Sequence, residues 1–125
     1  MIKTIVVDDD RKFLQRINSF LFSDESIEVV GEAYNGRNVI KLCKELQPDL
    51  VIMDIRMPVM DGVQATKEVT DKFPDIKVIV LTVFDFKEYR EASMNAGASA
   101  YILKKKMYTD LLLNIHQLCE NTDSR

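Results

Sequence analysis

The stretch Leu50-Val51-Ile52-Met53-Asp54 decides the fold class of this chain, because a continuous apolar run ends abruptly on an acid. A short apolar run without alternation is typical of a strand that is covered on both faces of a parallel sheet. Three other apolar runs also end on polar groups, which are Asp8 with Asp9, Thr82 and Lys104. Since ligands bind at the carboxyl ends of the strands in an open parallel sheet, we expect these groups to share one crevice.

Segments with helical spacing of apolar residues separate the expected strands. The strands are expected at residues 2–7, 27–30, 50–53, 76–81 and 99–103. Five strands that alternate with five helices through short connections favour right-handed crossovers and a parallel sheet covered on both faces. The sequence therefore predicts an α/β fold, a doubly wound five-stranded parallel sheet of order 2-1-3-4-5, which is the flavodoxin-like order.

A single domain accounts for most of the chain. With 125 residues, 46% hydrophobic and 30% charged, the chain can bury one core. We expect that domain to span residues 1–120, followed by a polar tail at residues 121–125. Its fourth helix is expected from about Asp85 to Ala96, with Gly97 in the left-handed conformation that ends many helices.

Composition excludes several classes of function. The formal net charge of -3 argues against a nucleic-acid-binding surface, because duplex binding depends on clustered positive charge, so any DNA contact requires another domain. No apolar stretch reaches the roughly 20 residues that span a bilayer, and the amino terminus lacks the order of a signal peptide. We expect a cytoplasmic protein without membrane contact. Cys43 and Cys119 lack the spacing of a zinc or redox pair, so we expect reduced thiols.

The acids at the strand ends have a chemical meaning only when taken together. An aspartate after a strand is usually a turn or helix-capping residue. Asp8, Asp9 and Asp54, however, follow two strands that are neighbours in the expected order, so their like charges require a cation. Because Mg²⁺ prefers carboxylate and carbonyl oxygens and keeps several waters, two side chains, one backbone carbonyl and solvent would form a reasonable site.

Five features of the chain together resemble the receiver domain of two-component response regulators. They are the pair Asp8-Asp9 after the first strand, Asp54 within the stretch 53–62, Thr82 at the end of strand four, and Tyr101 with Lys104 on strand five. The resemblance covers essentially the whole chain. It implies that Asp54 accepts a phosphoryl group from the phosphohistidine of a sensor histidine kinase, and that the protein catalyses only its own phosphorylation and dephosphorylation.

The resemblance also assigns a role to each neighbour of Asp54. Asp9 and Asp54 would hold Mg²⁺ together with the backbone carbonyl of Arg56, while Asp8 would bind through water or orient the ion. Mg²⁺, Thr82 and Lys104 would each contact one phosphoryl oxygen, because phosphoryl transfer is mainly a problem of position and charge.

Thr82 and Tyr101 would form the conformational switch. The output face would comprise the fourth helix, the fifth strand and the fifth helix. We expect it to control association with a second copy of the chain in response to phosphorylation.

A finer resemblance concerns the subgroup. The segment 29–36 and the absence of proline after Lys104 look like the NarL/FixJ (LuxR-type) regulators, whose members usually carry a carboxy-terminal helix-turn-helix domain. We therefore expect transcription to be controlled through a DNA-binding domain that these residues do not include. Without proline, a cis bond would cost about 3 kcal/mol, so we predict a trans peptide between Lys104 and Lys105.

Other readings of the same residues remain open. A stand-alone receiver could act by protein–protein interaction. A small magnesium-dependent phosphatase with an aspartate nucleophile is less favoured, because Arg56 stands two residues after Asp54, where a general acid would be needed. A flavin carrier is not favoured, because this chain has no glycine-rich phosphate loop after the first strand.

Two further residues have an interpretation from the sequence. His116, the sole histidine, is interpreted as a surface or boundary residue. Val83 is hypothesised to limit the access of water and small phosphodonors to the site.

Overall fold

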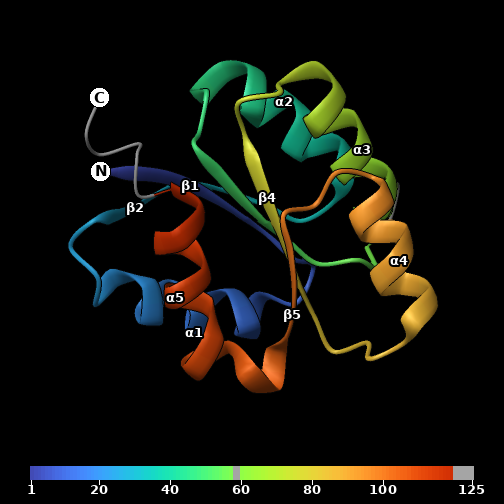
Figure 1. The fold of residues 1–125 in the computed structure, drawn as a ribbon. Coiled ribbons are helices and arrows are strands. Elements are labelled where there is room, and N and C mark those ends of the chain that lie inside the picture. The colour runs from blue at the N-terminus through green and yellow to red at the C-terminus, as the bar shows by residue number, and fades with distance from the viewer. Residues whose placement is uncertain (58–59, 120–125) are drawn as a thin grey trace.

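Five parallel strands alternate with five α-helices in the computed structural model, which describes residues 1–57 and 60–119 (Figure 1). The strand order is β2-β1-β3-β4-β5, which confirms the predicted doubly wound, flavodoxin-like sheet. The elements, in chain order, are β1 (Ile2–Val7), α1 (Arg11–Phe22), β2 (Ile27–Ala33), α2 (Gly36–Leu46), β3 (Leu50–Met53), α3 (Gly62–Lys72), β4 (Lys77–Thr82), α4 (Lys87–Asn95), β5 (Ala100–Leu103), a short 3-10 turn (Lys104–Lys106) and α5 (Met107–Cys119).

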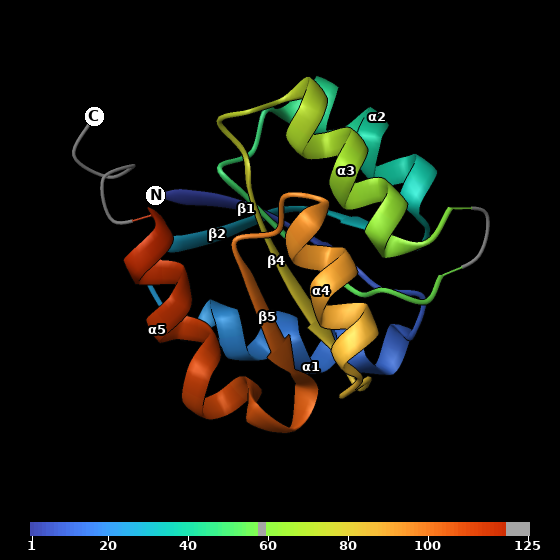
Figure 2. The same ribbon diagram turned by 45° about the vertical axis from the view of Figure 1, so that its right-hand side comes forward.

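Helices cover both faces of the sheet. Figures 1 and 2 show α1 and α5 on one face and α2, α3 and α4 on the other. Each helix returns the chain to a strand that runs parallel to the preceding one, so all five strands end at the same edge. That edge carries the loops in which the predicted site residues lie.

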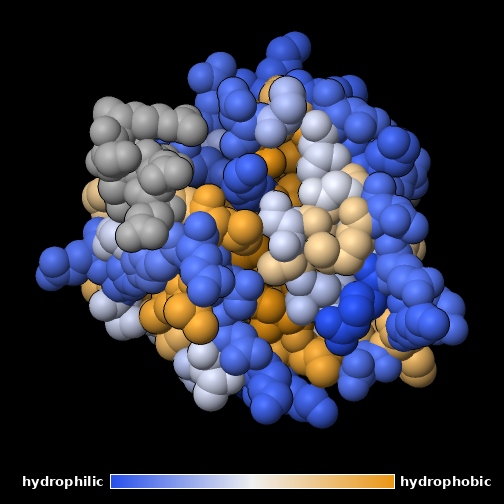
Figure 3. Space-filling model, viewed as in Figure 1, coloured by the Kyte–Doolittle hydropathy of each residue, from blue (hydrophilic) through white to orange (hydrophobic). Residues whose placement is uncertain are grey.

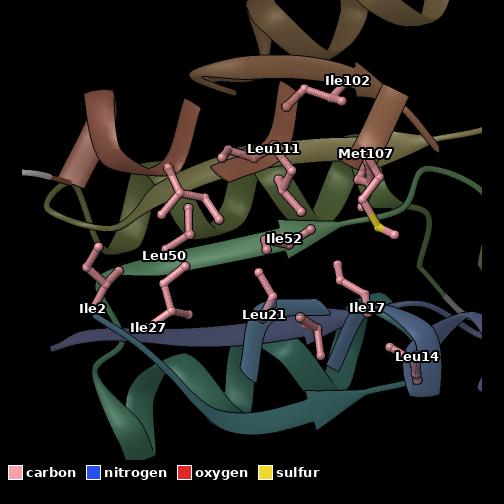
Figure 4. Packing of buried hydrophobic residues seen from close by; sticks show 14 of the residues in the cluster. Ile2, Leu14, Ile17, Leu21, Ile27, Leu50, Ile52, Ile102, Met107 and Leu111 are labelled. Carbon is pink, nitrogen blue, oxygen red and sulfur yellow. The ribbon is translucent and has the colours of Figure 1, made fainter. Parts of the chain in front are cut away.

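The core between the sheet and the pair α1 and α5 is built from branched apolar side chains. Ile17 and Leu21 of α1 face Ile52 of β3 and Leu111 of α5, as Figure 4 shows. All four side chains are buried. Since burying one such side chain contributes roughly 1.5–3 kcal/mol, this layer fixes the position of α1 against the sheet.

Polar caps and left-handed residues set the helix ends. The side chains of Asp10, Asn35 and Asp61 accept hydrogen bonds from backbone N–H groups in the first turns of α1, α2 and α3. Gly97 has a φ of 107°, and a Cβ atom there would lie 2.5 Å from the Thr70 hydroxyl. The predicted left-handed terminator after α4 is therefore confirmed.

Two predicted boundaries differ from the structure by two residues or more, and the fourth and fifth strands and the end of α4 differ by one residue. Strand β2 continues to Ala33 rather than ending at Val30, because its pairing with β1 shifts register between Thr4 and Ile5 and then resumes. Helix α4 begins at Lys87 rather than Asp85, because the backbone at Phe86 is extended.

Other expectations hold within the described residues. No cis peptide bond is found there, which confirms the trans Lys104–Lys105 bond. Cys43 and Cys119 are both buried, and burial raises the pKa of the Cys43 thiol to about 12. Among the described helices, none has both the length and the apolar character to cross a bilayer. The predicted tail at residues 121–125 lies outside the described residues.

Candidate phosphorylation site

Three carboxylates meet where β1 and β3 end side by side. Val7 pairs with Met53, so Asp8 and Asp54 are the next residues on neighbouring strands, and the Asp54 N–H donates to the Val7 carbonyl at 3.0 Å. Asp9 is exposed, whereas Asp8 and Asp54 are buried. One carboxylate oxygen from each of the three acids lies within 4.8 Å of the others. The strand ends therefore concentrate negative charge in one place.

Lys104 brings the opposite charge to this acid cluster of Asp8, Asp9 and Asp54. It follows β5 directly, and its Nζ lies 2.7 Å from Asp8 Oδ2 and 3.5 Å from Asp54 Oδ2. Only 14% of its side chain is exposed, so water screens these ion pairs weakly. Lys104 thus offsets part of the repulsion between the acids.

Burial and a neighbouring negative charge both affect the pKa of Asp8. Burial raises this pKa, and the nearby charge of Asp54 raises it further. The Lys104 ammonium and the Asp10 N–H, which donates to Asp8 Oδ1 at 2.9 Å, act in the opposite direction without cancelling the effect. Three carboxylates face the Lys104 ammonium, so the cluster keeps a net negative charge when all three acids are ionised. Its donor set consists of carboxylate oxygens, which fits a hard divalent cation such as Mg²⁺.

The loop after Asp54 passes very close to its backbone. A Cβ atom at Gly62 would lie 1.8 Å from the Asp54 carbonyl oxygen, and the Gly62 N–H donates to the Ile55 carbonyl at 2.6 Å. Only glycine fits this approach. The loop places Arg56 in the lining of a cleft of about 740 Å³ that Asp9 also lines, on the solvent side of the acid cluster.

Thr82 and Tyr101 are linked through the backbone of one residue, Phe84. The Thr82 hydroxyl, at the buried end of β4, accepts the Phe84 N–H at 3.4 Å, and the Tyr101 hydroxyl donates to the Phe84 carbonyl at 2.6 Å. Burial raises the pKa of the Tyr101 phenol. The Arg56 guanidinium stands 5.3 Å from the centre of the Phe84 ring, while Val83 is 65% exposed. The residues predicted as a switch are thus joined by the loop between β4 and α4.

Sequence reasoning missed two contacts. The ring centre of Phe13 lies 4.0 Å from Lys104 Nζ, and His116 Nε2 lies 2.6 Å from Asp24 Oδ2. The helical spacing of apolar residues is typical of a core position for Phe13 and gives no sign of a partner on another element. His116 is 44% exposed, in line with a boundary residue, but 92 positions separate it from Asp24 in the chain.

A family model for the response regulator receiver domain matches residues 4–116. The chain is a response regulator receiver domain. It is 43% identical over 112 residues to the response regulator protein VraR of Staphylococcus epidermidis, which covers 88% of this chain and 53% of VraR. The receiver domain spans about half the length of the curated relatives it matches.

Solved structures give the same answer. A DNA-binding response regulator of the LuxR family from Staphylococcus aureus matches with a TM-score of 0.89 at 29% identity, covering 94% of this receiver and 98% of that chain. The signal receiver domain of NarL from Mycobacterium tuberculosis matches with a TM-score of 0.89 at 27% identity, covering 95% and 96%. The predicted family and its LuxR/NarL subgroup are therefore confirmed.

Proposed function

We propose that Asp54 is the phosphoacceptor of this receiver and takes its phosphoryl group from the phosphohistidine of a sensor histidine kinase. The observation that carries the proposal is the grouping of Asp8, Asp9 and Lys104 around the Asp54 carboxylate. An Asp54 carboxylate oxygen attacks phosphorus, the bond from phosphorus to the histidine nitrogen breaks, and that nitrogen keeps the electron pair. The product is an aspartyl phosphate on Asp54.

The acid cluster is the proposed magnesium site. Asp9, Asp54 and the backbone carbonyl of Arg56 would hold Mg²⁺, with Asp8 contributing through water or by orienting the ion. When bound, the ion supplies the positive charge that phosphoryl transfer requires on the transferring oxygens. The charge balance supports this assignment, because the carboxylates of Asp8, Asp9 and Asp54 lie within 4.8 Å of one another and the Lys104 ammonium offsets one of their three negative charges.

Lys104 and Thr82 are the proposed protein contacts to the phosphoryl oxygens. Lys104 already lies beside Asp54, so its ammonium can pass from a carboxylate to a phosphoryl oxygen with a small movement of a flexible side chain. Thr82 ends the strand next to β3, and its hydroxyl carries a proton that it can donate to a phosphoryl oxygen. Both groups act by stabilising charge that develops on transfer.

Thr82 and Tyr101 are the proposed switch, with the Phe84 peptide between them. If the whole Thr82 side chain rotates toward a phosphoryl group, its oxygen leaves the Phe84 N–H without an acceptor, and the carbonyl that holds Tyr101 belongs to the same residue. The output surface is then α4, β5 and α5. Figure 3 shows apolar surface between α4 and α5, where β5 lies at the edge of the sheet. That surface suits a phosphorylation-dependent contact with a second copy.

The proposed output is control of transcription. The matched proteins include a DNA-binding response regulator of the LuxR family, and this receiver covers 53% of VraR. We place the receiver at residues 1–120 and propose a cytoplasmic protein that reaches DNA through a domain outside these residues. A stand-alone receiver that acts by binding a protein partner is the alternative; the small phosphatase remains the weaker one.

Intact-mass measurement tests the phosphoacceptor proposal. We expect incubation with phosphoramidate to add one phosphoryl group in the presence of Mg²⁺, and chelation to abolish the adduct. Asp54→Asn should prevent it, whereas Asp71→Asn, which neutralises an exposed acid of α3 paired with Lys67, should not. An adduct that persists in Asp54→Asn would refute the assignment of the acceptor.

A further inference from the structure

We propose that Phe13 is a positioning residue for Lys104, and that the face of its ring holds the ammonium beside the acid cluster before and during phosphoryl transfer. This inference rests on the proposed function of Lys104. The ring centre of Phe13 lies 4.0 Å from Nζ. That distance is well inside the roughly 6 Å over which an aromatic face attracts a cation.

The ring closes the third side of a small site for the ammonium. Asp8 and Asp54 contact Nζ at 2.7 Å and 3.5 Å, and the Phe13 ring lies against it at 4.0 Å. Since the Lys104 side chain is only 14% exposed, little water competes for these contacts. Lysine has a flexible four-carbon chain, so a contact that does not depend on either carboxylate narrows its range of positions.

The same turn that carries Asp8 also fixes Phe13. Asp8 Oδ1 accepts the N–H of Asp10 at 2.9 Å, and Asp10 Oδ1 accepts the N–H of Phe13 at 3.2 Å. Phe13 is buried in the apolar layer that joins α1 to the sheet. Its ring is therefore a fixed wall, whereas Lys104 is the movable part.

An aromatic wall suits a lysine that must change partners. A carboxylate in the place of the ring would add negative charge and compete with the phosphoryl group for the ammonium. The ring face attracts the cation but accepts no strong hydrogen bond from it. Phe13 can thus keep Lys104 near Asp54 while leaving its N–H groups available for a phosphoryl oxygen.

Truncation of Phe13 would be a poor test, because a cavity of about 10 Å³ already lies between Phe13, Asp8 and Asp54. A smaller side chain would enlarge it enough to admit water. We therefore suggest replacing Phe13 by phenylalanines with one, two or three ring fluorines, which weaken the negative ring face with little change in shape. The same trifluorinated residue at Phe20, a half-buried ring on the same helix that packs against Tyr108, is the matched control.

Two readouts are needed. The first is the rate constant of phosphorylation by phosphoramidate at saturating Mg²⁺. We expect it to fall stepwise with each fluorine, by about tenfold in total, which corresponds to about 1.4 kcal/mol. The trifluorinated Phe20 variant should stay within about twofold of wild type, since the Phe20 ring packs against Tyr108, whereas the Phe13 ring lies against Lys104.

The second readout is the proton NMR shift of the Lys104 ε-methylene group. A ring face beside Nζ should shift these protons upfield, both in the free protein and with beryllium fluoride and Mg²⁺ bound. If the wild type is phosphorylated but the rate constant stays flat or rises across the fluorinated Phe13 series, the proposed role of Phe13 is wrong. Loss of the upfield shift with beryllium fluoride would also overturn it. Failure of wild type to be phosphorylated would instead refute the proposed function, and the shift of the free protein would still test the contact.

Discussion

Helices α1 and α4 flank the same site but are attached to the sheet in different ways. Helix α1 buries Phe13, Leu14, Ile17 and Leu21, all apolar. Among the described residues of α4, only Ser93 is buried, and the helix lacks a side-chain cap at its amino end. A helix with several buried apolar side chains is held firmly against the sheet, whereas a helix with few buried contacts can open locally at a low cost in free energy. The site is therefore built on the firmly packed side, where α1 lies, and its state is read out on the weakly packed side, where α4 lies.

Core truncation should give the largest difference between the two helices. We expect Leu21→Ala in α1 to lower the free energy of unfolding by about 3 kcal/mol, because it removes a fully buried side chain. Met94→Ala in α4, where the side chain is 44% exposed, should cost less than about 1 kcal/mol. Urea denaturation followed by circular dichroism measures both. Similar losses in the two variants would contradict the proposed asymmetry.

Neutralising Asp8 should stabilise the metal-free protein. Because burial and Asp54 raise its pKa, the folded state disfavours the charged form, and this penalty is present at neutral pH. The penalty for charged Asp8 is relieved as the pH falls from the raised pKa of the folded state to the ordinary pKa of an aspartate, because Asp8 then becomes protonated. We expect Asp8→Asn to add about 1 kcal/mol to the unfolding free energy without Mg²⁺, and to weaken the stabilisation that Mg²⁺ gives to wild type. A metal-free variant less stable than wild type at pH 7 would refute this account.

Removal of a buried hydroxyl from α4, the weakly packed helix, should raise the stability of the protein. Within the described residues, the hydroxyls of Ser93 in α4 and Thr66 in α3 are buried without a hydrogen-bond partner. Since an unsatisfied buried hydroxyl is costly, we expect Ser93→Ala to stabilise the protein by about 0.5–1 kcal/mol. Thermal unfolding should show a higher midpoint. Ser19→Ala, at an exposed position of α1, serves as the control and should leave the midpoint unchanged.

The smallest effect is expected at the pair of Asp24 and His116, which ties α5 to the loop after α1. Burial alone would raise the pKa of Asp24, but hydrogen bonds from Ser26 and His116 outweigh it, so the pKa is lowered. The stabilisation is therefore present at neutral pH and is lost as the pH falls through that lowered pKa. We expect His116→Gln to cost about 0.2–0.4 kcal/mol at pH 7 and to flatten the acid limb of the stability curve. An unchanged acid limb would show that the pair does not contribute.

Much of this arrangement could be predicted from the sequence, because it depends on local patterns. Unbroken apolar runs located the strands, and acids after two neighbouring runs located Asp8 and Asp54. The extension of β2 could not be predicted, since it depends on how a shifted register resumes against β1. The contacts of Phe13 with Lys104 and of Asp24 with His116 depend on how helices are rotated against the sheet, which spacing alone does not determine.

The most direct test is amide hydrogen exchange with and without beryllium fluoride and Mg²⁺, a mimic of the phosphorylated state. Without them, we predict faster exchange in α4 than in α1. On binding, we predict that protection changes in the loop 83–86, in α4 and in β5, while the amides of α1 around Ile17 stay unchanged. Equal protection of the two helices in the free protein, or a change confined to α1, would contradict the claim that the site is built on one side and read on the other.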